Sequence, residues 1–160
     1  IRLLLRLETL CATGIRVSEL QYIPVEAARN GVVEIALKGK IRTILLPTKL
    51  CRKLLKYAKK CGIVHGQIFL TKKGTGLSRK FIWAEMKKLC EAAKVARSKV
   101  FPHNLRGLFA RTFYAACRDV VRLADVLGHS SIEMTRIYRL STAKESARQL
   151  DRIGLLSGWA

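Results

Sequence analysis

Acidic residues are scarce in this chain of 160 residues, and their scarcity is its first informative property. Only 11 Asp and Glu accompany 31 Lys and Arg, which gives a formal net charge of +20 at pH 7. Such an excess makes a compact state repel itself. A polyanionic partner relieves that repulsion, because each neutralised nucleic-acid phosphate releases counterions. The composition therefore favours nucleic-acid binding, with a ribosome-associated protein or a merely basic one as the alternatives.

The chain also lacks the patterns of several other protein classes. No apolar run reaches the length of a membrane span, and no lipidation motif occurs, so nothing in the sequence indicates a membrane partner. The first residues carry charges within their apolar stretch and no cleavage motif, which excludes a signal peptide. Five scattered cysteines form no Cys-x-x-Cys pair, and three histidines lie far apart. This pattern argues against a zinc site and favours a reducing cytoplasm.

Apolar residues make up 49% of the chain, which is enough for one domain with a core of its own. Two β-rich runs around the turn Lys38-Gly39-Lys40 predict a β-hairpin over 31–47, and 67–70 is a candidate third strand. Apolar spacing predicts helices over 3–13, 17–21, 49–61, 78–96, from 102 onward, and over 119–127. The predicted fold is mainly α with a small antiparallel β-sheet (α+β).

The clearest chemical pattern lies at 127–138. A nine-residue gap on one uninterrupted helix would place His129 and Tyr138 on opposite faces. Gly128 breaks the preceding helix, however, and Ser130-x-x-Glu133 is a capping box that begins a new one. His129 therefore belongs to the turn and Tyr138 to the far end of the new helix, so both can face one site. Taken alone, Tyr138 would be interpreted as a packing residue.

Two further groups of residues supply positive charge. His103 and Arg106 lie three residues apart, so they share one face of a helix that begins at Pro102, with Leu105 and Leu108 as its anchors. An arginine offers donors that match two phosphate oxygens, and a histidine can hold or move a proton. Arg16 follows a Thr-Gly turn. Each group alone is equally typical of a solvated basic surface.

Together, three motifs resemble the tyrosine recombinase (phage integrase) family. They are Thr13-Gly14-Ile15-Arg16-Val17-Ser18-Glu19-Leu20, His103-Asn104-Leu105-Arg106, and Leu127-Gly128-His129 followed by Tyr138. The motifs occur in the family's order with the family's internal spacing, and they extend over nearly all of the chain. The resemblance implies that residues 1–160 are a catalytic domain, and that the family's N-terminal DNA-clamping domain and the first part of the catalytic domain are absent.

The resemblance implies a role for each matched position. Tyr138 would attack a DNA phosphodiester to give a 3′-phosphotyrosine and a free 5′-hydroxyl. Arg16 and Arg106 would bind the non-bridging oxygens as negative charge grows in the transition state. His129 would donate a hydrogen bond to the same phosphate, and His103 would assist proton transfer. No metal and no cofactor is implied, because the cationic side chains stabilise the charge and the phosphotyrosine conserves bond energy.

Other matched positions would support this site. The family's hairpin lysine, which protonates the leaving oxygen, falls on Lys38, with Lys40 as the alternative. Glu19 matches an acidic residue that holds the site together. Position 107, often a second histidine in the family, is Gly107 here. Contacts with DNA are expected from Lys40, Arg42, Arg79 and Lys80.

The implied function is site-specific recombination of double-stranded DNA, for integration or excision of a mobile element or for resolution of replicon dimers. The family also implies a homotetramer on DNA, in which the segment 141–156 contacts a neighbouring protomer. The expected location of this bacterial or phage-encoded protein is the cytoplasm, at the nucleoid when it is on DNA. Two alternatives stay open. One is a type IB topoisomerase, which uses similar phosphotyrosine chemistry. The other is a catalytically idle DNA-binding accessory factor.

Overall fold

The computed structural model describes residues 2–37, 40–71 and 74–128. Within them the chain is mostly helical with a two-stranded antiparallel sheet, which confirms the predicted fold class. The elements are α1 (Arg2–Thr13), a 3-10 turn η1 (Leu20–Tyr22), α2 (Val25–Asn30), β1 (Val32–Leu37), β2 (Lys40–Leu45), α3 (Thr48–Lys60), α4 (Arg79–Ala92), a 3-10 turn η2 (Arg97–Lys99), α5 (Pro102–Cys117) and α6 (Val120–Leu127). None of the described helices has the length and hydropathy of a membrane span.

The hairpin buries one face because side chains alternate along each strand. Val33 pairs with Ile44 and both are buried, whereas Ile41 and Leu45 of β2 are exposed. Arg42 pairs with Ile35, so it lies on the inward face of the sheet with Ile44. A charged side chain on the buried face of a strand requires partners within the protein.

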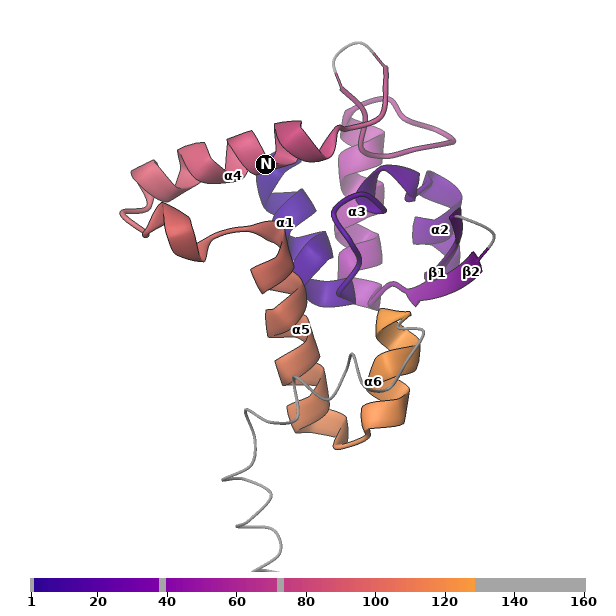
Figure 1. Cartoon of the computed structure of the whole chain (residues 1–160). Helices are drawn as coiled ribbons and strands as arrows, with labels where there is room; N and C mark the ends of the chain where they lie inside the picture. Colours follow the sequence, from indigo (N-terminus) through magenta and orange to yellow (C-terminus); the bar gives the residue numbers. More distant parts are fainter. Residues whose placement is uncertain (1, 38–39, 72–73, 129–160) are drawn as a thin grey trace, which may run out of the picture.

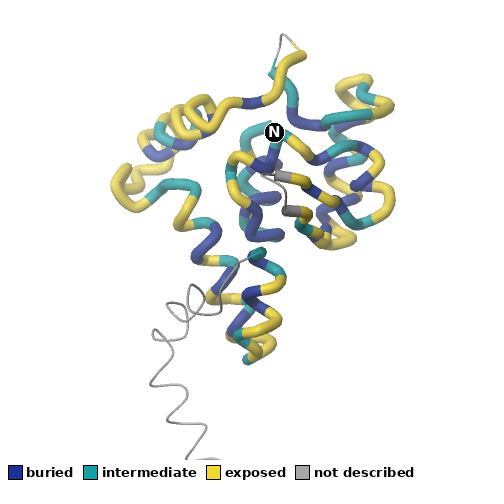
Figure 2. Tube along the Cα trace, turned by 45° about the vertical axis from the view of Figure 1, so that its right-hand side comes forward, coloured by how far each residue is buried: buried dark blue, intermediate teal, exposed yellow. Residues whose placement is uncertain are grey.

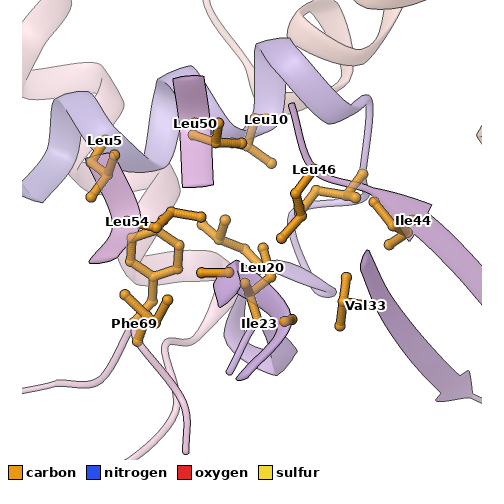
Figure 3. Packing of buried hydrophobic residues seen from close by; sticks show 14 of the residues in the cluster. Leu5, Leu10, Leu20, Ile23, Val33, Ile44, Leu46, Leu50, Leu54 and Phe69 are labelled. Atoms are coloured by element: carbon orange, nitrogen blue, oxygen red, sulfur yellow. The ribbon is translucent and has the colours of Figure 1, made fainter. Parts of the chain in front are cut away.

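The main core lies between α1, α2, α3 and the inner face of the hairpin (Figure 3). It includes Leu5, Leu10, Leu20, Ile23, Val33, Ile44, Leu46, Leu50, Leu54 and Phe69. A second, smaller cluster joins α5 to α6 and consists of Ala110, Tyr114, Leu123 and Leu127. Figure 1 shows α5 and α6 side by side, extending away from the main core, with one end of α6 next to β2.

Helix α4 is attached to this body by a narrow strip. Its buried residues are Ile82, Met86 and Cys90, and most of the rest of the helix is exposed (Figure 2). The guanidinium of Arg6, fully buried in α1, pairs with the Glu85 carboxylate of α4. Burial lowers the pKa of Arg6 from its ordinary value, and the Glu85 carboxylate opposes that shift. One buried ion pair thus connects two helices far apart in sequence.

Several predicted boundaries are confirmed. The hairpin and the helices that begin at Thr48, Arg79 and Pro102 lie where the sequence placed them. Ser78 caps α4, since its hydroxyl oxygen accepts a hydrogen bond from the Phe81 amide at 3.1 Å.

Other expectations were wrong. The candidate strand 67–70 forms only two isolated bridges, Pro24 with Gln67 and Leu70 with Gly76. The helix expected over 17–21 is the 3-10 turn η1, and the helix expected to reach 96 ends at Ala92. That end is hidden in the sequence, because a lysine, Lys94, adopts the left-handed conformation in place of a glycine. The short helix α2 was not predicted.

The core predicts a contrast between two leucines. Leu54 of α3 is 0% exposed, so Leu54→Ala should lower the free energy of unfolding by about 2–5 kcal/mol through lost burial and a cavity. Leu45 of β2 is 68% exposed, and Leu45→Ala should change it by no more than about 0.5 kcal/mol. Urea denaturation followed by circular dichroism measures both. Equal losses for the two variants would contradict this assignment of the core.

Candidate active site

The first part of the site is the turn that follows α1. Gly14 adopts φ +62° at the end of the helix, and its amide donates to the Leu10 carbonyl at 3.0 Å. The ring of Phe109, from α5, lies where a β-carbon at Gly14 would stand. Ile15 is buried directly after the turn. The backbone that connects α1 to Arg16 is therefore fixed by the Phe109 ring at Gly14 and by the burial of Ile15.

Glu19 is the polar centre of the site. Its side chain is 2% exposed, and its Oε2 atom accepts hydrogen bonds from the Arg16 amide at 2.7 Å and from Arg42 Nη1 at 2.6 Å. Its Oε1 atom accepts from Arg16 Nη1 at 3.1 Å. The side chain of Arg16 itself is 46% exposed. The buried carboxylate thus holds one edge of a guanidinium whose remainder faces solvent.

Arg42 differs from its predicted role. The sequence indicated a DNA contact, but the side chain is only 9% exposed and points into the protein. Besides its contact with Glu19, Arg42 Nη2 donates to the Val126 carbonyl of α6 at 3.0 Å. Burial lowers the pKa of the Arg42 guanidinium, and the Glu19 carboxylate opposes that shift. The physical reason for the difference is strand alternation, which places Arg42 on the buried face.

Arg106, in the first half of α5, is buried. Its Nη1 atom donates to the Gly14 carbonyl, and its Nη2 atom donates to the Leu127 carbonyl at 2.6 Å. His103, one turn earlier in α5, is exposed. Leu108, expected to anchor this helix, is also exposed, and the buried residues next to Arg106 are Gly107 and Ala110 instead.

Four segments that are distant in sequence are therefore joined by the side chains of Arg42, Arg106 and Glu19. They are the turn after α1, strand β2, the first half of α5 and the last turn of α6. Gly128 closes α6 in the left-handed conformation, with φ +63°. Lys38, His129 and Tyr138 lie outside the described residues, as does the side chain of Lys40.

Arg79 and Lys80 are exposed in the first turn of α4. Among residues 2–37, 40–71 and 74–128, no three His, Cys, Asp or Glu side chains lie close enough together to hold a metal ion. The described part of the site is thus built from cations around a single buried acid.

The sequence profile of the phage integrase family matches residues 1–145. The chain belongs to the phage integrase family. This confirms the resemblance carried by its three motifs.

Individual members of the family resemble this integrase-family chain over nearly its whole length. The tyrosine recombinase XerD of Xanthomonas axonopodis is 34% identical over 149 residues, which cover 84% of this chain and 49% of that protein. The tyrosine recombinase XerA of Pyrococcus furiosus is 32% identical over 154 residues, covering 92% and 53%. The chain therefore spans about half the length of these curated relatives.

A solved structure gives the same result for the fold. The pre-cleavage complex of the site-specific recombinase XerH with its difH substrate superposes with a TM-score of 0.74 at 26% identity. The superposition covers 91% of this chain and 44% of the XerH chain.

The site predicts that two glycines with the same backbone conformation differ in their tolerance of a side chain. Gly14 and Gly62 have φ +62° and +69°, so alanine is strained at both by about 1–2 kcal/mol. Only Gly14 faces a ring, that of Phe109, whereas nothing lies within 4 Å of a β-carbon at Gly62.

Gly14→Ala should therefore lower the free energy of unfolding by about 1–3 kcal/mol more than Gly62→Ala, as expected for overpacking. Urea denaturation of the two variants side by side measures the difference. If the two variants were equally stable, the packing of Phe109 against the turn would be disproved.

Proposed function

We propose that this chain is the catalytic domain of a site-specific DNA recombinase that cleaves and rejoins double-stranded DNA through a covalent 3′-phosphotyrosine. The observation that carries the proposal is the half-exposed guanidinium of Arg16, held at one edge by the buried Glu19 carboxylate. Arg106 adds a second positive charge beneath the same turn, through its contact with Gly14. A half-exposed guanidinium with a second, buried positive charge near the same turn suits a phosphate whose charge increases during reaction.

The reaction follows from these groups and from the motif residues. The Tyr138 phenolate oxygen attacks the phosphorus, the bond to the 5′-oxygen breaks, and the 5′-oxygen takes a proton from Lys38, with Lys40 as the alternative donor. Arg16 stabilises the negative charge on the non-bridging oxygens by hydrogen bonds, and Arg106 does so through its nearby charge. Rejoining is the reverse attack by a 5′-hydroxyl, so no external energy source is consumed.

The two histidines complete the proposal. His103 is exposed one turn before Arg106, where it can exchange a proton with a bound substrate or with water. His129 follows Gly128 directly in the chain, and we assign it a hydrogen bond to the reacting phosphate. A tyrosine has a pKa of about 10, so its attack near neutral pH requires cationic neighbours or a base.

Binding of DNA outside the reacting phosphate is assigned to the exposed basic surface. Arg79 and Lys80 stand exposed at the start of α4, and the net charge of +20 favours a polyanion. By analogy with the family, we further propose a homotetramer on DNA in which the segment 141–156 contacts a neighbouring protomer. Integration, excision and dimer resolution share this chemistry, and all take place in the cytoplasm at the nucleoid.

The covalent intermediate is the decisive prediction. A binding site is first identified by selecting duplexes from a random pool for binding to the Tyr138→Phe variant. A series of duplexes is then made in which a single nick lies at a different position of that site, so that cleavage next to the nick traps the covalent complex. Wild-type protein should give a covalent protein–DNA band on a denaturing gel. Tyr138→Phe should give none while binding the same duplex with unchanged affinity.

Two other outcomes would support the alternative functions. Binding without any covalent band from wild type, at every nick position, would show an idle DNA-binding module. Relaxation of supercoiled plasmid without site preference would instead show a type IB topoisomerase.

A second experiment should distinguish the catalytic arginine, Arg16, from the DNA-binding residues Arg79 and Lys80. Arg16→Ala should lower the single-turnover rate of covalent complex formation on the order of 100-fold or more, with the Kd for DNA changed by no more than about threefold. The double variant Arg79→Ala/Lys80→Ala should weaken binding and reduce the slope of log Kd against log salt by about two. A larger loss of affinity for Arg16→Ala than for the double variant would contradict these roles.

A further inference from the structure

We infer that Arg42 is a positioning residue for the proposed reaction. It holds Glu19, the partner of Arg16, at a fixed position relative to the end of α6. The inference rests on the proposed function, because it assigns a role in that same site. Arg42 does not touch the reacting phosphate in this assignment. It acts through Glu19 on one side and through the last turn of α6 on the other.

The two contacts of Arg42 are made by the two terminal nitrogens of its guanidinium. Arg42 Nη1 lies 2.6 Å from Glu19 Oε2, and Nη2 lies 3.0 Å from the Val126 carbonyl oxygen. The guanidinium is planar and rigid, so two contacts made by its two terminal nitrogens fix the distance between their acceptors. The turn after α1 and the end of α6 are therefore held at one separation by a group from a third element, β2.

Arginine side chains bind the carbonyl groups at the end of α6. The last carbonyls of a helix have no partner within the helix and carry partial negative charge. Arg42 binds the Val126 carbonyl and Arg106 binds the Leu127 carbonyl, so two arginines from different elements hold adjacent groups of one helix end. A β-carbon at Gly128 would overlap the Arg42 side chain, which shows how closely the two residues pack. His129 is the next residue in the sequence.

Arg42 is connected to Arg16 through Glu19. Glu19 divides its two carboxylate oxygens between Arg42 and Arg16, and Oε2 is shared by Arg42 Nη1 and the Arg16 amide. Removing Arg42 leaves this buried carboxylate with Arg16 as its one cationic partner among the described residues. The carboxylate would then move towards Arg16 and change the direction of its exposed guanidinium.

Stability alone does not explain an arginine at this position. Arg42 is 9% exposed, and its Nε atom is buried without a hydrogen-bond acceptor in the described part of the chain. Replacing a buried ion pair by well-packed apolar residues is often neutral or stabilising, whereas the two contacts of Arg42 hold two segments at one separation, which an apolar residue could not do. Arg42 also lies two residues after Lys40 in β2, so the same contacts hold the strand on which Lys40 lies.

The test compares three variants on the nicked duplex described above. Arg42→Met removes both contacts and keeps an apolar stem. Arg42→Lys keeps the charge but, as a single ammonium group, cannot reproduce the two-ended fork. Arg29→Met is the matched control, because Arg29 also joins distant segments by donating to a backbone carbonyl, that of Val64 at 3.1 Å, and it takes no part in the contacts of the site.

Single-turnover rates of covalent complex formation are measured at saturating DNA, together with Kd at several salt concentrations and the thermal midpoint of each variant. Arg42→Met should lower the rate on the order of 10- to 100-fold, as a displacement of about 1 Å does, with Kd within about threefold of wild type and an unchanged salt slope. Arg42→Lys should recover part of the rate. Arg29→Met should keep the wild-type rate.

Several results would overturn the inference. An unchanged rate in Arg42→Met would do so directly. Weaker binding with a salt slope reduced by about one, and a normal rate at saturation, would show a DNA contact instead. An equal loss of rate in Arg29→Met would show a general effect of stability.

Two further results keep the test decisive. If Arg42→Met does not fold, a folded Arg42→Lys with the wild-type rate overturns the inference by itself. Absence of a covalent complex from wild-type protein is a separate result, which refutes the proposed function and the role of Arg42 within it.

Discussion

The structure depends on the burial of one carboxylate in a strongly basic chain. Glu19 is 2% exposed and is satisfied by the Arg16 amide and by the guanidinium groups of Arg16 and Arg42. A buried charge without such partners would be unstable, so its burial requires the turn after α1 to meet strand β2. The fold and the site therefore share their central constraint, since the contacts that neutralise the acid also place the half-exposed arginine.

The α5–α6 pair is joined to the rest of the molecule in a different way. Its own apolar cluster is small, and Arg106 of α5 donates both to the Gly14 carbonyl of the turn after α1 and to the Leu127 carbonyl of α6. Backbone acceptors keep their positions whatever side chain they carry, so these contacts depend on local helix geometry and little on neighbouring sequence. Arg106 consequently combines two tasks, support of a helix end and positive charge beneath the site.

The sequence was sufficient to predict the fold class, the hairpin and the main helices, because these depend on local periodicity and capping such as that of Ser78. The family motifs also located Arg16, Glu19 and Arg106, which the structure brings together. The orientation of Arg42 was missed, although it alternates in phase with the buried Ile44, because a basic residue near a basic turn was interpreted as a DNA contact. The end of α4 was missed because a lysine adopts a conformation that usually indicates glycine.

Helix α1 acts as a spacer of fixed length between two parts of the molecule. Near the start of α1, Arg6 is paired with Glu85 of α4. Directly after its end, the Gly14 carbonyl accepts a hydrogen bond from Arg106, and Arg16 follows two residues later. The eight residues from Arg6 to Gly14 correspond to about 12 Å along a helix axis. One inserted residue would lengthen the spacer by about 1.5 Å and rotate its ends by about 100° relative to each other. The length of α1 therefore sets both the distance and the direction of the basic helix α4 relative to the site.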